Sequence, residues 1–140
     1  MQVQPYLNFD GRTEEALDFY RRTIGAEVVF MMRYKESPEP TAPGMVPTGS
    51  ENKILHSTFR VGDSSLMASD CHCQGKATFE GISLSLTLSD EAKAKRIFEA
   101  LGEGGQVRMP LTKTFFSPCF GMLADRFGLG WMIYVPGPNG

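Results

Sequence analysis

The segment QPYLNFDGRTEEALDFYRRTIG, residues 4–25, decides the fold because a strand pattern passes directly into a helix pattern. Up to Phe9 the side chains alternate between apolar and polar, which is typical of a strand with one buried face. Apolar residues then follow helical spacing from Thr13, whose hydroxyl we expect to cap the helix, until Gly25 ends it. We therefore predict a strand over residues 1–9 followed by an amphipathic helix.

The same pattern returns 77 residues later, in GISLSLTLSDEAKAKRIFEALG at residues 81–102, where Ser89 is the expected cap. At this offset Leu7 aligns with Leu84 and Gly25 with Gly102. Each segment is followed by further strand patterns, at residues 26–33, 53–61 and 64–70 in the first half and 106–111, 120–125 and 129–135 in the second. We therefore predict an α+β fold of two tandem βαβββ modules, at about residues 1–70 and 81–136, within one domain of residues 1–140.

Residues 35–52 carry too many prolines and glycines for regular structure. A loop this long in a compact domain is usually functional or mobile. Its place between two strands of the first module leaves two interpretations. It is either a lid that becomes ordered on contact with a ligand or a second subunit, or a solvated insertion.

The charge balance and the hydropathy of the chain limit the classes of partner that we expect it to bind. The 140 residues carry 14 basic and 16 acidic side chains, a net charge of -2, whereas proteins that hold nucleic acid through its phosphates have a basic excess. No apolar run approaches the ~20 residues needed to cross a bilayer. The three cysteines are few and odd in number, as expected for reduced thiols. We therefore expect a cytoplasmic protein that binds neither nucleic acid nor membrane.

Strand parity gives each predicted sheet one apolar and one polar face. The apolar face, expected to lie against the helices, includes Leu7, Leu55, Phe59, Ile82, Leu84 and Trp131. The opposite face is either simply hydrated or encloses a cleft for a small molecule. Its large apolar side chains favour the cleft, because their exposure to water is unfavourable. The candidate ligand-binding residues on that face are Gln4, Tyr6, Asn8, His56, Arg60, Ser83, Ser85, Met132 and Tyr134.

His56 is the candidate catalytic residue, because an imidazole can exchange a proton near neutral pH. A structural histidine, hydrogen-bonded across the sheet, is the competing interpretation. Arg60, two residues along the same face, either pairs with an anionic ligand or lies along the edge of the sheet. Tyr6 and Tyr134 are either pocket walls or core aromatics.

The tripeptide Cys71-His72-Cys73 contains zinc-ligand side chains. Structural zinc sites usually space their paired cysteines by two to four residues and supply a second pair elsewhere. Here one residue separates the cysteines and no second cluster follows. We therefore favour a polar link between the two modules and predict no metal.

The motifs PYLNF at residues 5–9, EEALDFY at 14–20, IGAE at 24–27, ILHS at 54–57 and DRFGLGWMI at 125–133 recur in an order that resembles the vicinal oxygen chelate superfamily. This superfamily includes glyoxalase I, bleomycin-resistance proteins and extradiol dioxygenases, and the chain is most similar to its PhnB-like branch. The resemblance covers nearly the whole chain. It implies two modules forming a U-shaped mixed sheet around a cleft, in a homodimer whose second subunit often completes the modules or the cleft.

The resemblance also implies the sequence positions at which metal ligands would be found. Metal-dependent members carry His, Gln or Glu on the inward faces of the first and last strands of each module. By position these places fall at Gln4 or Pro5, at Leu66 or Met67, at Ser83 and at Met132. A single neutral amide cannot hold a hard divalent ion. We therefore expect neither a metal nor another cofactor.

The resemblance implies a PhnB-like protein of unassigned activity that binds a small molecule in the sheet cleft without the usual divalent metal. Bleomycin-resistance-type sequestration, which needs a cleft and no catalyst, is compatible with this. The alternative is a metal-dependent lyase or dioxygenase-type enzyme with a noncanonical site that includes His56. Some members of the branch carry a ubiquinone-type methyltransferase label. We do not expect that activity, because the glycine cluster at residues 102–105 follows a helix, not a first strand.

Overall fold

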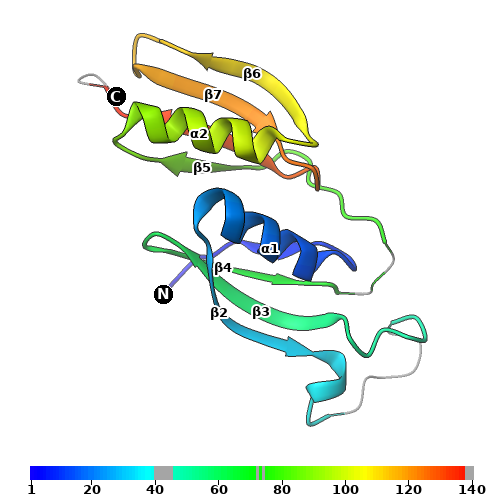
Figure 1. Cartoon of the computed structure of the whole chain (residues 1–140). Coiled ribbons are helices and arrows are strands. Elements are labelled where there is room, and N and C mark those ends of the chain that lie inside the picture. The colour runs from blue at the N-terminus through cyan, green and yellow to red at the C-terminus, as the bar shows by residue number, and fades with distance from the viewer. Residues whose placement is uncertain (40–45, 72, 74, 138–140) are drawn as a thin grey trace. The chain divides into compact units, whose positions relative to one another are not determined.

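A computed structural model describes residues 1–39, 46–71, 73 and 75–137 of the chain. The elements fall into two compact units, Met1–Ala77 and Thr78–Gly140 (Figure 1). Unit 1 contains β1 (Tyr6–Asn8), α1 (Thr13–Ile24), β2 (Glu27–Arg33), the short 3-10 helix η1 (Tyr34–Glu36), β3 (Ile54–Val61) and β4 (Ser64–Ser69). Unit 2 contains β5 (Ser83–Thr87), α2 (Glu91–Gly102), β6 (Gln106–Thr112), β7 (Cys119–Ala124) and β8 (Gly130–Val135).

The two units have the same sheet topology. The strand order is β1-β4-β3-β2 in unit 1 and β5-β8-β7-β6 in unit 2. In each unit the first strand runs parallel to the last, and the remaining neighbours are antiparallel. Together with the one α-helix described in each unit, this confirms the predicted α+β fold of repeated βαβββ elements. The U-shaped arrangement around a cleft stays a prediction.

Helix α1 buries aromatic side chains against one face of the sheet in unit 1. The ring of Tyr20 stacks on Phe59 of β3, with 6.2 Å between the ring centroids, and lies 6.1 Å from the ring of Phe9. All three side chains are buried, as is Leu7 of β1. This face is the apolar face that strand parity predicts.

In unit 2, α2 packs against β7 at a glycine. A Cβ at Gly121 would lie 2.8 Å from the ring of Phe98, so the helix approaches more closely than any other residue type allows. Trp131 of β8 is buried, and its indole Nε1 donates to Asp125 Oδ2 at 2.9 Å. Trp131 thus lies on the buried, apolar side of the strand, as strand parity predicts.

Both predicted helix caps are wrong. Thr13 is the first helical residue of α1, and a carboxylate from the end of β4 takes its place as cap. Oδ1 of Asp70 accepts from the backbone N–H groups of Gly11 and Thr13, each at 2.9 Å. In unit 2 the cap is Asp90, which accepts from the first-turn amides of α2, and not the preceding Ser89.

Two apolar residues also depart from the predicted faces. The pairing of β2 with β3 shifts register after Met32, which pairs with His56, so Leu55 is the extra residue of a bulge. As a result Ile54 is fully buried and Leu55 only half-buried. Ile82 precedes β5 and is 52% exposed. Neither the bulge nor the late strand start is visible in the alternation of side chains.

Candidate functional site

Each sheet has a helix-free face, which we define as the face opposite its own α-helix. In unit 1 one row of side chains crosses this face on four strands, because Tyr6 pairs with Met67, Met67 with Thr58, and Thr58 with Phe30. Tyr6 is 52% exposed and Phe30 is 47% exposed. Large aromatic side chains on such a face are a signal of a binding surface when they lie together.

The imidazole of His56 joins these two aromatic side chains into a cluster. Its Nδ1 lies 3.2 Å from the hydroxyl of Tyr6, and the tautomer of the ring decides which atom donates. The centroid of the His56 ring lies 5.7 Å from that of Tyr6 and 6.2 Å from that of Phe30. We refer to Tyr6, Phe30 and His56 as the aromatic cluster.

The cluster combines a flat apolar surface with one group able to transfer a proton. Because Tyr6 engages Nδ1, the other ring nitrogen of His56, Nε2, faces no hydrogen-bonding partner among the described residues. Nor does any described carboxylate contact the ring. The arrangement can therefore stack a planar molecule and hydrogen-bond it, and it lacks the acid partner that usually orients a catalytic histidine.

The remaining predicted residues of unit 1 have structural partners or lie outside the strand. Arg60 forms an ion pair with Glu27 across β2 and β3 at 3.0 Å. Asn8 accepts from the backbone N–H of Asp10 at 2.9 Å and so fixes the turn into α1. Gln4 is half-buried and precedes β1. The structure brings together only Tyr6 and His56 from the unit 1 set.

In unit 2, Met132 and Tyr134 lie on the helix-free face, since the alternating residues of β8 are buried on the other side. Their partners on β5 are Ser85, which pairs with Met132, and Thr87, which pairs with Tyr134. Ser83 pairs with Gly130 at the beginning of the same two strands. The four predicted residues of unit 2 thus share one face.

Sequence reasoning missed the aromatic side chains that surround Tyr134. The Phe116 ring centroid lies 5.1 Å from that of Phe120 and 6.1 Å from that of Tyr134. Three methionines lie beside them, because Met122 pairs with both Met132 and Met109. The alternation of Phe120 and Met122 around Gly121 was the available signal.

The side chains at the expected metal-ligand positions do not fit a divalent cation. Met67 and not Leu66 faces away from α1, because Leu66 is 5% exposed and in the core. The donors are then the amide of Gln4, the hydroxyl of Ser83 and the thioethers of Met67 and Met132. These neutral or soft groups suit neither a hard ion nor zinc. Across the described residues, no three His, Cys, Asp or Glu side chains gather in a group able to hold a metal.

The segment that follows β4 is held by Tyr34, whose hydroxyl donates to the carbonyl of Cys71. Burial raises the pKa of the Tyr34 hydroxyl to about 12. Burial also raises the pKa of the Cys73 thiol, so this side chain is a poor thiolate donor at neutral pH. The third member of the predicted tripeptide, His72, and residues 40–45 of the predicted lid lie outside the described residues.

Comparison with known proteins identifies the family. The model of the 3-demethylubiquinone-9 3-methyltransferase family matches residues 1–134. The chain belongs to this family. Protein YjdN of Escherichia coli K12, a curated relative, is 34% identical over an alignment of 140 positions that covers 96% of this chain and 95% of YjdN.

Solved structures agree with this family assignment. Protein PA1353 from Pseudomonas aeruginosa has 39% identity and a TM-score of 0.83, covering 97% of this chain and 98% of that one. A Bacillus cereus PhnB protein, described as a putative 3-demethylubiquinone-9 3-methyltransferase, has 29% identity and a TM-score of 0.79, covering 96% and 99%. The fosfomycin resistance protein FosX from Mesorhizobium loti shares the fold, with 13% identity, a TM-score of 0.62 and coverage of 99% and 93%. The predicted PhnB-like branch is therefore confirmed, and the likeness to FosX shows that the two proteins share a fold.

Proposed function

We propose that this protein binds a small organic molecule with an aromatic or apolar ring on the helix-free faces of its sheets, without the usual divalent metal. The observation that carries the proposal is the aromatic cluster of unit 1. Tyr6 and Phe30 lie on either side of His56 and leave about half of their surface exposed. Aromatic pairs are worth about 0.5–1.5 kcal/mol beyond burial, so a planar ligand gains by completing such a group.

Unit 2 supports the same ligand chemistry. Its helix-free face carries the rings of Phe116, Phe120 and Tyr134 beside the methionines of β6, β7 and β8. Methionine side chains are flexible and polarisable, and they adapt to ligands of different shape. An aromatic and methionine-lined surface suits binding or sequestration of an apolar molecule.

Indole is a suitable neutral probe for this proposal. We expect saturable changes in the NMR amide signals of Tyr6, Phe30 and His56 when indole is added to the full chain. Phe30→Ala should weaken binding by about 2- to 10-fold, the equivalent of one aromatic contact. Phe115→Ala is the matched control for the signals of the aromatic cluster, because Phe115 is 90% exposed and belongs to unit 2, where its ring contacts Phe116. Equal binding by both variants, or no saturable change, would contradict the proposal.

The second candidate is a metal-dependent lyase or dioxygenase-type enzyme that uses His56 in a noncanonical site. It is favoured by Nε2 of His56, which has no hydrogen-bonding partner in the described part of the chain. Elemental analysis of protein purified without added metal tests it. A stoichiometric transition metal that disappears in His56→Ala would replace our proposal with this one.

Methyl transfer is not part of the proposed function, although the family description names it. Enzymes that use S-adenosylmethionine in the usual way approach it with a glycine-rich turn after the first strand of a parallel sheet. Here the glycine cluster of residues 102–105 begins at the last residue of α2, and the sheets are mixed. Calorimetry with S-adenosylmethionine should therefore show no saturable binding.

We further propose a homodimer in the cytosol. A homodimer is supported by the fold family, in which a second subunit often completes the modules. A reducing compartment is supported by the three cysteines, which are all free. Within the described residues neither helix is long and apolar enough to cross a membrane. Analytical ultracentrifugation should give twice the monomer mass of 15.5 kDa.

A further inference from the structure

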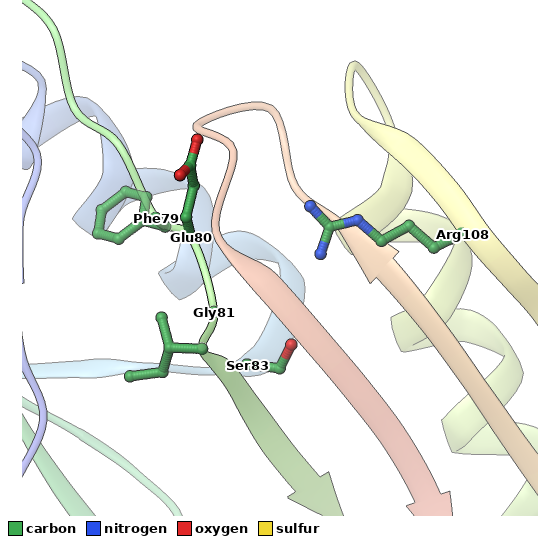
Figure 2. Close-up of a pocket in the computed structure, with 6 residues that line it drawn as sticks. Phe79, Glu80, Gly81, Ser83 and Arg108 are labelled. Carbon is green, nitrogen blue, oxygen red and sulfur yellow. The ribbon is translucent and has the colours of Figure 1, made fainter.

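Unit 2 contains a second candidate binding site at the beginning of β5. A surface pocket of about 370 Å³ is lined by Phe79, Glu80, Gly81, Ile82, Ser83 and Arg108. Figure 2 shows the Arg108 side chain extending from β6 across the neighbouring strands toward Ser83, with Glu80 on the opposite side of the pocket. The pocket therefore has a basic side, an acidic side and a hydroxyl between them.

A bulge in β6 presents Arg108 to this pocket. Val107 pairs with Leu123 and Met109 with Met122, so Arg108 is the extra residue between two successive pairs. A bulge re-aims a side chain that would otherwise follow the alternation of the strand. The guanidinium can thus reach over β7 to β8.

Gly130 of β8 provides the space into which the guanidinium fits. A Cβ at this position would lie 3.0 Å from Nη1 of Arg108 and 2.7 Å from Oγ of Ser83. Both polar groups therefore converge on one point above Gly130. Any other residue type would displace them.

The guanidinium of Arg108 and the hydroxyl of Ser83 are both available to a ligand. The side chains of Arg108 and Ser83 make no hydrogen bond or ion pair with any described residue, and this includes Glu80, which lines the same pocket. An arginine next to an unused hydroxyl presents several N–H donors and one O–H donor to the pocket. An arginine fork matches the two oxygens of a carboxylate or phosphate group.

We infer that this pocket binds the carboxylate of a small monocarboxylic acid, with Arg108 and Ser83 as the donors. Glu80 favours a singly charged ligand, because its own negative charge repels a second one. Ile82 lines the pocket and is 52% exposed, so it offers an apolar surface to the rest of the acid. The inference goes beyond the proposed function, because it uses no residue of the aromatic cluster.

Benzoate is the probe for this site, and benzamide is its uncharged counterpart. We expect benzoate to shift the NMR amide signals of Ser83, Arg108 and Gly130 saturably at millimolar concentration, and benzamide to leave them unchanged. Arg108→Gln should weaken benzoate binding at least about 10-fold, because a charge-assisted pair is lost. Gly130→Ala should weaken it as well, since the added methyl group occupies the space of the guanidinium.

The matched control is Arg96→Gln, which removes the same charge from an exposed position on α2 that does not line the pocket. Benzoate binding equal to that of the unaltered protein is expected for this control. Unchanged binding in Arg108→Gln, equal binding of benzamide, or tighter binding of inorganic phosphate would each overturn the inference. Because the signals are assigned to single residues, shifts at Tyr6 and His56 report on the proposed function separately.

Discussion

The buried carboxylate of Asp70 joins three backbone segments of unit 1. Asp70 is 1% exposed, and its carboxylate accepts from the backbone N–H groups of Gly11, Thr13 and Ile54. One side chain therefore joins the start of α1 to the beginning of β3. Removing a buried acceptor that serves several donors lowers the free energy of unfolding, because the donors are left without partners.

Asp70→Asn should destabilise the protein by about 2–4 kcal/mol, because the amide loses the charge and turns one N–H group toward a backbone donor. Chemical denaturation measures the free energy of unfolding. Asp63→Asn is the matched control, since Asp63 is exposed in the β3–β4 turn. A difference between the two variants of less than about 0.5 kcal/mol would contradict this role of Asp70.

Tyr34 should make stability depend on alkaline pH. Burial raises the pKa of its hydroxyl from 10.0 to about 12 in the folded chain. The folded state therefore holds this proton more tightly than the unfolded state, and the resulting stability is present below pH 10.0 and is lost as the pH rises toward 12. Tyr34→Phe should remove this loss, so the curves of stability against pH for the two proteins should converge in that interval.

Ultraviolet titration of the folded protein checks the same point. A tyrosine transition at a pH of about 12 should be absent from Tyr34→Phe and retained in Tyr134→Phe. If both variants keep the transition at high pH, Tyr34 is not the tyrosine whose pKa is raised by burial.

At the scale of single residues, the sequence predicted the positions that depend on local alternation and missed those that depend on distant contacts or bulges. Tyr6 and His56 were placed on one face because strand parity needs only the local alternation of side chains. The cap of α1 could not be found in the same way, because Asp70 lies more than fifty residues from the helix it caps. Arg108 was also missed, because a bulge interrupts the parity at that position.

At the scale of elements, the packing of α2 on β7 depends on one glycine. Gly121→Ala should destabilise unit 2 by about 1–3 kcal/mol, because its Cβ would lie 2.8 Å from Phe98 and 3.0 Å from Leu111. Gly102→Ala is the control at the end of α2, where the nearest atom is 3.8 Å away. That variant should be neutral or more stable by up to about 1 kcal/mol, because alanine favours the helix.

Thermal unfolding of both variants separates steric crowding from a general effect of adding a methyl group. A lower melting temperature for Gly121→Ala and an unchanged or higher one for Gly102→Ala is the expected pair of results. Equal destabilisation by the two substitutions would show that the close approach of α2 to β7 is not the cause.

Most elements follow from periodicity, whereas their ends do not. The helix that ends at Ile24 is followed by Gly25 in a left-handed conformation, as glycine at that place indicates. The predicted first strand, in contrast, shortens from residues 1–9 to Tyr6–Asn8, because only these residues pair with β4. Alternating side chains show which face is buried but not which residues find a pairing partner.

At the scale of the whole molecule, the repeat explains why the fold was predictable while the site was predictable only in part. Two segments with the same order of elements produce the same strand order in both units. The side chains on the two helix-free faces differ, however, with the aromatic cluster on one and a row of methionines on the other. The fold depends on the shared apolar pattern, and the chemistry depends on residues that the repeat does not share.

The central claim is that a small organic molecule binds on these faces without a divalent metal. The most direct test is an NMR titration of the full chain with indole, carried out in the presence and absence of EDTA. We predict saturable shifts at Tyr6, Phe30 and His56 that are the same in both titrations. Shifts that vanish with EDTA and return on addition of a divalent ion, or no saturable shifts at all, would contradict the claim.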